Sequence, residues 1–265
     1  MNLETICEKV TETAKKAGNL IRNERINFSL DQVQSKGLHD FVTNIDKASE
    51  EFIYKRLMDI IPEAGFLAEE NTHFIKGETY NWIVDPLDGT TNFIHGLYPY
   101  AVSIALTRNS ELVLGVIYEI GADEMFYAWE NSGAFCNEKR IEVSLKNSLK
   151  DSLIATGFPY SDFSNMSSFL KSLEFFMENS HGLRRLGSAA VDLAYLARGQ
   201  FEGFYEYNLS PWDVAAGAII VQQAGGKICD FSGGSNYLFG NEIIAANSGI
   251  FDEFYQTINH IMLHM

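Results

Sequence analysis

The stretch Trp82-Ile83-Val84-Asp85-Pro86-Leu87-Asp88-Gly89-Thr90-Thr91-Asn92-Phe93 carries the pattern on which the fold and the site both depend. The apolar run that opens it predicts a buried strand, and Pro86 removes a backbone donor where that strand ends. Asp85 and Asp88 lie one turn apart, and the Leu87 carbonyl between them can point the same way. The strand exit therefore offers hard oxygen ligands to a cation.

The residues that follow add a place for an anion. Gly89 permits close backbone approach, and Thr90-Thr91-Asn92 is typical of the capped start of a short helix with free N–H groups. An Asx-type turn would explain a single Asp-Gly pair. Two aspartates between a strand exit and a helix start favour a binding site over that simple turn.

Two further acidic positions stand out because of their neighbours. Glu69-Glu70 directly follows the apolar strand candidate Phe66-Leu67-Ala68, and Asp213 opens a helix of small apolar residues. Taken alone, the first would be a solvated edge and the second a helix cap. Carboxylates that a fold brings together repel one another unless protons or cations neutralise them. An oxygen-only set suits Mg²⁺, and no His or Cys at ligand spacing indicates zinc or copper.

The rest of the chain predicts mixed α/β layers. Apolar residues at steps of three and four indicate helices near 3–21 and 43–61, whereas 27–40 lacks a period and is predicted as a connecting loop. Strands are expected near 66–68 and 82–84, an antiparallel meander over 100–107, 112–119 and 124–129, and further strands near 153–156, 183–186, 203–205, 227–229 and 243–246. Helices are expected near 166–177, 189–197, 214–223 and 251–263. No repeat or linker interrupts residues 1–265, so we expect a single domain with mixed sheets.

Composition narrows the class of protein. Twenty Lys+Arg against 35 Asp+Glu give a net charge of −15, which argues against nucleic-acid and anionic-membrane partners. A hydrophobic share of 46% excludes a disordered chain. The three scattered cysteines, Cys7, Cys136 and Cys229, indicate reduced, buried thiols. The N-terminus is charged and every apolar run is short, so the predicted location is the cytoplasm.

Two long motifs resemble the signatures of the inositol monophosphatase family of magnesium-dependent, lithium-sensitive phosphatases. They are Asp85-Pro86-Leu87-Asp88-Gly89-Thr90-Thr91-Asn92-Phe93 and Trp212-Asp213-Val214-Ala215-Ala216-Gly217, the latter leading to Ala224-Gly225-Gly226. Shorter elements are similar in the same order: Asp40-Phe41-Val42-Thr43-Asn44-Ile45-Asp46, Ala68-Glu69-Glu70, Gly187-Ser188-Ala189-Ala190 and Glu206. The resemblance covers essentially the whole chain. It implies a layered αβαβα sandwich of the sugar-phosphatase (inositol monophosphatase/fructose bisphosphatase) type, commonly dimeric.

The resemblance also implies a role for each matching position. Two to three Mg²⁺ ions would be held by Glu69, Asp85, the Leu87 carbonyl, Asp88 and Asp213. The substrate would be bound by Glu69, Leu87, Asp88, Gly89, Thr90, Gly187, Ser188, Ala189, Glu206 and Asp213. In catalysis, Glu69 and Thr90, the latter tied to Asp46, would orient and deprotonate the attacking water.

The implied activity is Mg²⁺-dependent hydrolysis of inositol 1-phosphate or a related small phosphate ester by metal-activated water. Relatives hydrolyse NADP(H), fructose 1,6-bisphosphate, histidinol phosphate or adenosine 3′,5′-bisphosphate, so these substrates stay open. A different class of protein, a non-enzymatic metal-binding or regulatory partner of the transcription machinery, is the other alternative. Ala68 replaces the usual Gly, which leaves open whether Glu69 or Glu70 is the closer metal ligand. The 36–40 loop, at the family's flap, is expected to be compact.

Overall fold

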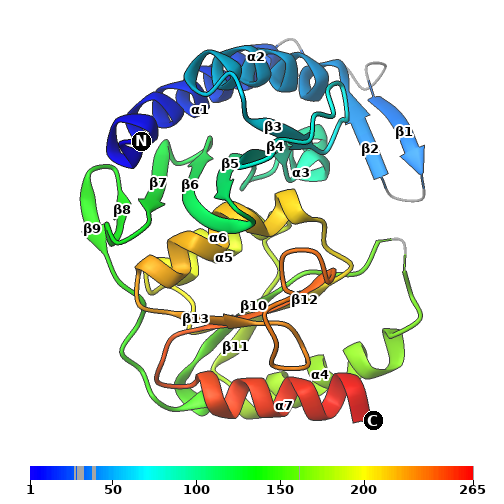
Figure 1. Cartoon of the computed structure of the whole chain (residues 1–265). Coiled ribbons are helices and arrows are strands. Elements are labelled where there is room, and N and C mark those ends of the chain that lie inside the picture. The colour runs from blue at the N-terminus through cyan, green and yellow to red at the C-terminus, as the bar shows by residue number, and fades with distance from the viewer. Residues whose placement is uncertain (27, 29–32, 38–39, 161, 265) are drawn as a thin grey trace.

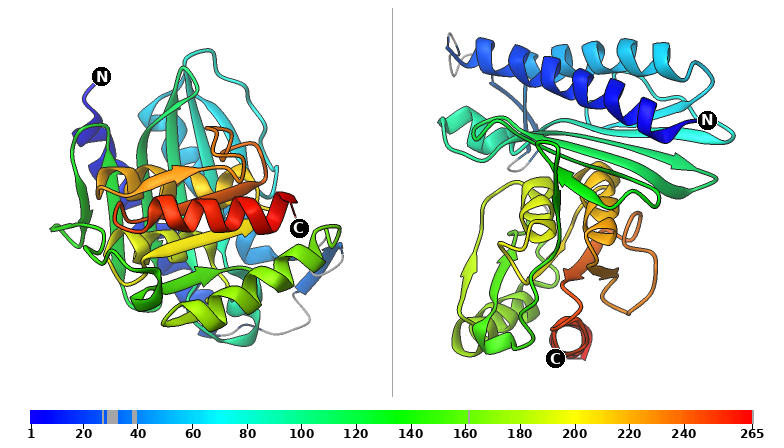
Figure 2. Two further views of the ribbon diagram at one scale, coloured as in Figure 1. Left: turned by 90° about the horizontal axis from the view of Figure 1, so that it is seen from below. Right: turned by 90° about the vertical axis from the view of Figure 1, so that its left-hand side faces the viewer.

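Five alternating layers of helices and sheets make up the structure, a computed structural model that describes residues 1–26, 28, 33–37, 40–160 and 162–264. Figure 1 shows the order of the layers, and the right-hand view of Figure 2 shows them edge-on. The outer helices are α1 (Leu3–Ile26) and α2 (Asn44–Ile60), the central ones α5 (Ala189–Ala197) and α6 (Pro211–Gln223), and the far ones α4 (Met166–Asn179) and α7 (Phe251–His264). A sheet separates each pair of layers from the next, so the αβαβα sandwich is confirmed.

The first sheet has seven strands and lies under α1 and α2. Its strands, in spatial order, are β3 (Gly65–Ala68), β4 (Tyr80–Asp88), β5 (Ala101–Arg108), β6 (Glu111–Glu119), β7 (Glu124–Trp129), β8 (Ala134–Cys136) and β9 (Lys139–Ile141). β3 pairs with β4 in parallel, and every later pair is antiparallel. The predicted meander is therefore confirmed. The short helix α3 (Thr90–His95) follows β4.

The second sheet has five strands and lies between the central and the far helices. Its strands, in spatial order, are β11 (Gly182–Arg184), β10 (Leu153–Thr156), β12 (Gly203–Tyr207), β14 (Glu242–Ala246) and β13 (Lys227–Cys229). β10 runs parallel to both of its neighbours, whereas β14 is antiparallel to both of its own. Both sheets are thus mixed, as the sequence pattern predicts.

Apolar burial accounts for the layering. One cluster joins α1 and α2 to the first sheet, another surrounds α5 and α6, and a third joins the second sheet to α4 and α7. α6 lies between the two sheets, so Val214–Val221 is buried on every side and has no polar face. The functional residues described below come from the ends of the elements around this central layer.

Some expectations were wrong or incomplete. Residues 27–40 are not simply a connecting loop, because β1 (Val33–Gly37) pairs with β2 (Asp40–Thr43) in an antiparallel hairpin. The expected compactness of the 36–40 loop falls partly on residues 38–39, outside the described residues. β8 and β9 have only three residues each, too few for an alternating pattern to reveal them. The single domain over residues 1–265 stays a prediction.

The cysteine and membrane expectations can be compared with the structure directly. Cys7, Cys136 and Cys229 are buried and free, as predicted. Among the described helices, none combines the length and the apolar character that a membrane crossing requires.

Candidate active site

A bulge at the end of β4 places Asp85 and Asp88 on the same side of the first sheet. Asp85 pairs with Ser103 of β5 and Asp88 with Ala101, so two residues of β4 oppose one residue of β5. Residues three apart in a regular strand point to opposite faces, and the extra residue in the bulge cancels that alternation. Pro86 lies within the bulge, where its missing N–H breaks no ladder bond.

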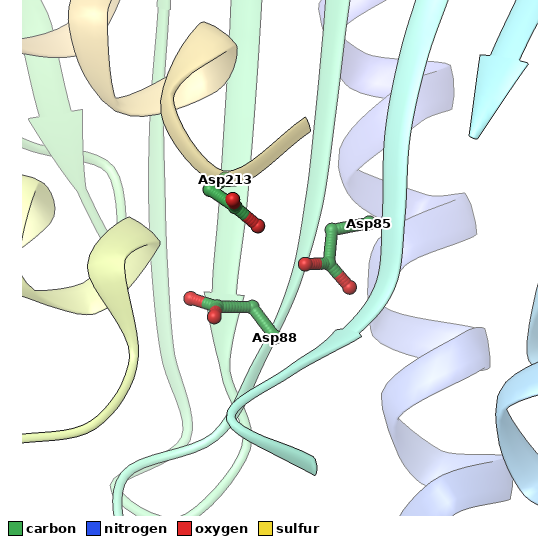
Figure 3. A group of neighbouring side chains, drawn as sticks. All are labelled: Asp85, Asp88 and Asp213. Atoms are coloured by element: carbon green, nitrogen blue, oxygen red, sulfur yellow. The ribbon is translucent and has the colours of Figure 1, made fainter. Parts of the chain in front are cut away.

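Asp213 joins this pair from the start of α6. Ligand oxygens of Asp85, Asp88 and Asp213 all lie within 4.8 Å of one another. Figure 3 shows the three carboxylates around one common space, two from β4 and one from the helix. Oδ2 of Asp213 also accepts a hydrogen bond of 2.6 Å from the Ser210 N–H. Asp213 is thus the third helical residue of a capping box whose N-cap is Ser210, and the same side chain also belongs to the acidic cluster.

The three carboxylates repel one another. Burial, followed by repulsion from Glu69, Asp88 and Asp213, raises the pKa of Asp85 well above its usual value. Burial, with repulsion from Asp88, does the same to the pKa of Asp213. Burial also raises the pKa of Asp88, to about 6. A hard cation would relieve this repulsion, and the all-oxygen donor set fits Mg²⁺.

Asp88 links the first sheet to the central helices. Its Oδ2 accepts a hydrogen bond from the Ser188 hydroxyl and another of 2.8 Å from the Ala190 N–H, at the start of α5. These donors oppose the effect of burial on the pKa of Asp88. The partial positive charge of a helix N-terminus also favours a carboxylate at this place.

The Thr90 hydroxyl lies between two acceptors. It is 2.9 Å from the Leu87 carbonyl oxygen and 3.2 Å from Oδ1 of Asp46. Asp46 is fully buried at the start of α2, where its other oxygen accepts from the backbone N–H and the hydroxyl of Thr43. Burial raises the pKa of Asp46, and these hydrogen bonds act against that rise. No side chain caps α3, because the residue at its N-cap is Gly89, with φ of +87°. The expected cap is absent there.

Glu69 and Glu70 lie in different surroundings. Glu69 lines the pocket beside Asp85, whereas the Glu70 N–H donates a hydrogen bond of 2.8 Å to Glu50 of α2. The Glu50 carboxylate also accepts from the backbone N–H of Thr72, at 2.8 Å. The turn after β3 is thus held by a buried carboxylate from the helix above it.

These groups surround one pocket of about 250 Å³. Of the predicted site residues, those that line it are Glu69, Asp85, Leu87, Asp88, Gly89, Thr90, Gly187, Ser188, Ala189, Glu206 and Asp213. Asp46 lies behind the wall and reaches it through Thr90. Sequence reasoning missed the other lining residues, which are Thr91, Gly157, Tyr160, Arg185, Asp192, Asn208 and Leu209.

Three of the lining side chains form a charged wall on the side of β12 and α5. Burial raises the pKa of Glu206 to about 8, and the Arg185 guanidinium opposes that rise. Burial, then repulsion from Glu206 and Asp88, raises the pKa of Asp192 well above its usual value. Arg185 lies over the rings of Phe158 and Tyr160, 5.4 Å from each centroid. Asp192 lies within a run of small apolar residues, so no local pattern in the sequence indicates it.

Comparison with known proteins gives a consistent result. The Inositol monophosphatase family matches residues 2–263. An inositol-1-monophosphatase of Mesorhizobium japonicum is 41% identical over 243 residues, 91% of each chain. A Haemophilus influenzae protein named Nus factor SuhB is 40% identical over 248 residues, 92% of each chain. The solved structure of extragenic suppressor protein suhB from Bartonella henselae has a TM-score of 0.90 at 40% identity, covering 96% of this chain and 98% of that one.

Fold and site together define a layered α/β protein with an acidic, oxygen-lined pocket where β4, α5, α6 and β12 meet. The chain belongs to the inositol monophosphatase family, and membership supports a phosphatase activity.

Proposed function

We propose that this protein is a Mg²⁺-dependent phosphomonoesterase that hydrolyses inositol 1-phosphate or a related small phosphate ester. The observation that carries the proposal is the convergence of Asp85, Asp88 and Asp213, which all line the pocket. A cation-binding scaffold needs only such carboxylates. The Thr90–Asp46 pair beside them has a further use, because a polarised hydroxyl can orient a water molecule for attack.

The proposed metal ligands are Glu69, Asp85, the Leu87 carbonyl, Asp88 and Asp213, for two to three Mg²⁺ ions. When bound, Mg²⁺ neutralises phosphate charge and lowers the pKa of a coordinated water. The chain's own residues bind the ester and orient the attacking water. Gly89 and Thr90 face the phosphate. Glu69 and Thr90 orient and deprotonate the attacking water, and Asp46 holds the Thr90 hydroxyl in place. Gly187, Ser188, Ala189 and Glu206 bind the alcohol portion.

A substrate panel tests this proposal. Phosphate release is measured from inositol 1-phosphate, fructose 1,6-bisphosphate, NADP⁺, histidinol phosphate and adenosine 3′,5′-bisphosphate, each with Mg²⁺, with EDTA and with Mg²⁺ plus Li⁺. We expect release that requires Mg²⁺, is inhibited by Li⁺ and is fastest with inositol 1-phosphate. A different ranking would reassign the substrate but keep the chemistry. If folded protein that binds Mg²⁺ released phosphate from none of these esters, the proposal would be contradicted.

A second candidate function rests on the relatives named Nus factor SuhB. By that likeness, the chain would be a regulatory partner of the transcription machinery rather than an enzyme, or in addition to one. Co-sedimentation with purified RNA polymerase, in parallel with the substrate panel, separates the two candidates. Catalytic silence together with polymerase binding would favour the regulatory function.

We further propose a cytoplasmic homodimer. The location is supported by the three free cysteines, which suit a reducing compartment. The dimer rests on the family resemblance, and sedimentation equilibrium tests it directly. A single species at the 29.8 kDa mass of the chain would contradict it.

A further inference from the structure

Asp192 is a buried carboxylate without a hydrogen-bond partner for one of its oxygens. The side chain is 1% exposed, and Oδ1 has no partner among the described residues. Its helix, α5, is otherwise almost entirely apolar and packs in the central layer. Burying a carboxylate without a partner lowers the stability of a fold, so packing does not explain an aspartate here.

The surroundings of Asp192 make the lack of a partner more costly. Glu206 and Asp88 are near enough to repel its negative charge, whereas the positive charge of Arg185 opposes that repulsion. The Nε of Arg185 is itself buried without a partner among the described residues, so the guanidinium is not fully engaged either. Asp192 of α5, Glu206 of β12 and Arg185, which lies between β11 and α5, all line the pocket and form the charged wall described above.

Two glycines keep this wall open. A Cβ at Gly157 would lie 1.8 Å from Oε1 of Glu206, and a Cβ at Gly187 would lie 2.6 Å from Nη1 of Arg185. Both charged groups therefore occupy space that a side chain would fill. Such placement suits a wall whose polar atoms face a ligand rather than one another.

We propose that Asp192 is a specificity-determining residue that, together with Glu206, accepts hydrogen bonds from hydroxyl groups of a polyol leaving group. The proposal deepens the proposed function and rests on it, since the ligand is the alcohol portion of the ester. Two acceptors on one wall match two hydroxyls on one sugar-like ring. A site with buried acceptors rejects an analogue that lacks the hydroxyls, because those acceptors are then left without partners. Arg185 acts as a positioning residue for both carboxylates.

The test compares inositol 1-phosphate with cyclohexyl phosphate, an ester with the same ring and no hydroxyls. We expect the wild-type protein with Mg²⁺ to prefer inositol 1-phosphate. Asp192→Asn keeps the shape but weakens the acceptor, so its kcat/KM for inositol 1-phosphate should fall about tenfold, chiefly through KM. The kcat/KM of Asp192→Ala for inositol 1-phosphate should fall further. For cyclohexyl phosphate, both variants should stay within about threefold of wild type.

Thermal unfolding supplies a readout that does not depend on activity. Asp192→Asn replaces a buried carboxyl group whose Oδ1 lacks a hydrogen-bond partner among the described residues and whose ionised form is repelled by Glu206 and Asp88, so its Tm should rise by about 3 °C. Glu202→Gln is the matched control, since Glu202 is equally buried, lies outside the pocket and is paired with Lys146 and the Leu153 N–H. That variant should have a lower Tm than the wild type and the same ratio of kcat/KM between the two esters.

The outcomes are distinguishable. An equal loss of kcat/KM on both esters, which leaves their ratio unchanged, would overturn the role of Asp192 and leave the phosphatase proposal intact. A lower Tm for Asp192→Asn would do the same. A wild-type protein that releases phosphate from neither ester would overturn the proposed function, and this inference with it.

Discussion

The Thr90 hydroxyl has one proton and two acceptors within reach. The Leu87 carbonyl is the nearer in this structure, at 2.9 Å, and Oδ1 of Asp46 lies at 3.2 Å. If the Leu87 oxygen holds Mg²⁺ as we propose, it would be a poorer acceptor, and the Thr90 hydroxyl would donate to Asp46 instead. A lone pair of Thr90 would then be free to accept a hydrogen bond from a water molecule.

Thr90→Val should therefore lower kcat about 100-fold or more while the protein still folds and binds Mg²⁺. Thr90→Ser keeps the hydroxyl and should restore most of the rate. Thr107→Val is the control, because that hydroxyl bonds to the Asn81 carbonyl within the first sheet. The measurement is steady-state phosphate release beside a thermal melt. Equal rates for the Val and Ser variants at position 90 would contradict the assigned role.

Gly157 has no side chain because Glu206 occupies that space. Gly157→Ala would force the Glu206 carboxylate out of position, since a Cβ would come within 1.8 Å of its Oε1. We expect KM for inositol 1-phosphate to rise about tenfold, with a smaller change in kcat, because we propose that Glu206 binds the alcohol portion of the ester and not the phosphate. A fall in kcat with KM unchanged, measured by steady-state kinetics, would contradict this reasoning.

Local pattern explains which site residues could be predicted. Asp85 and Asp88 belong to one continuous motif with its own turn chemistry, and Asp213 begins a helix with a strong apolar run. Asp192 lies inside an apolar helix, where nothing nearby in the sequence distinguishes it. Its importance depends on Glu206 and Arg185, which only the folded chain brings to it.

One face of α2 forms hydrogen bonds with three separate segments around the site. Asp46, Ser49 and Glu50 are fully buried and spaced so that they share that face. Asp46 contacts Thr90, the Ser49 hydroxyl donates a bond of 3.1 Å to the Pro86 carbonyl, and Glu50 accepts from the turn after β3. The helix thus acts as a template for the bulge in β4 and for the turn that carries Glu69.

Glu50→Gln tests this template. The amide supplies one acceptor oxygen where the carboxylate supplies two, so one of the N–H groups of Glu70 and Thr72 loses its partner. We expect the free energy of unfolding to fall by about 2 kcal/mol and the Mg²⁺ concentration for half-maximal rate to rise. Glu12→Gln on the exposed face of α1 is the control and should change neither. An unchanged Mg²⁺ requirement would show that the turn does not depend on Glu50.

The sequence predicts the long helices well and the short strands poorly, and the difference has a physical reason. Long helices such as α1 and α7 repeat their apolar residues over several turns, so their pattern is strong. The hairpin β1–β2 and the strands β8 and β9 are short and are held by backbone pairing, which leaves little trace in side-chain alternation. The bulge in β4 was also hidden, although Pro86 within the strand was a signal for it.

At the scale of the whole molecule, the five buried carboxylates with raised pKa values that line the pocket make stability depend on pH. These are Asp85, Asp88, Asp192, Glu206 and Asp213. A raised pKa means that the folded state binds more protons than the unfolded state. The stability that this proton binding contributes is fully present below the unfolded pKa near 4. It is lost as the pH rises through about 6 for Asp88 and about 8 for Glu206.

The metal-free protein in EDTA should therefore show a falling Tm from pH 5.5 to 8.5. The proposed Mg²⁺ would compete with protons for the same oxygens, so the rise in Tm that it produces should grow over this window. Differential scanning calorimetry at several pH values, with and without Mg²⁺, measures both trends. A flat Tm in EDTA together with a constant Mg²⁺ increment would contradict the electrostatic account of the site.

The order of the cluster along the chain has a consequence for synthesis. Asp213 follows Asp88 by 125 residues, and α5, which supplies the Ser188 and Ala190 donors to Asp88, also comes late. A growing chain therefore exposes two aspartates long before their third member and their hydrogen-bond donors have left the ribosome. Until then these carboxylates stay hydrated and the first sheet has one uncovered face. If the cluster binds Mg²⁺ as we propose, we expect the nascent chain to acquire native affinity for the ion only once α6 has emerged, so that metal binding would mark a late stage of assembly.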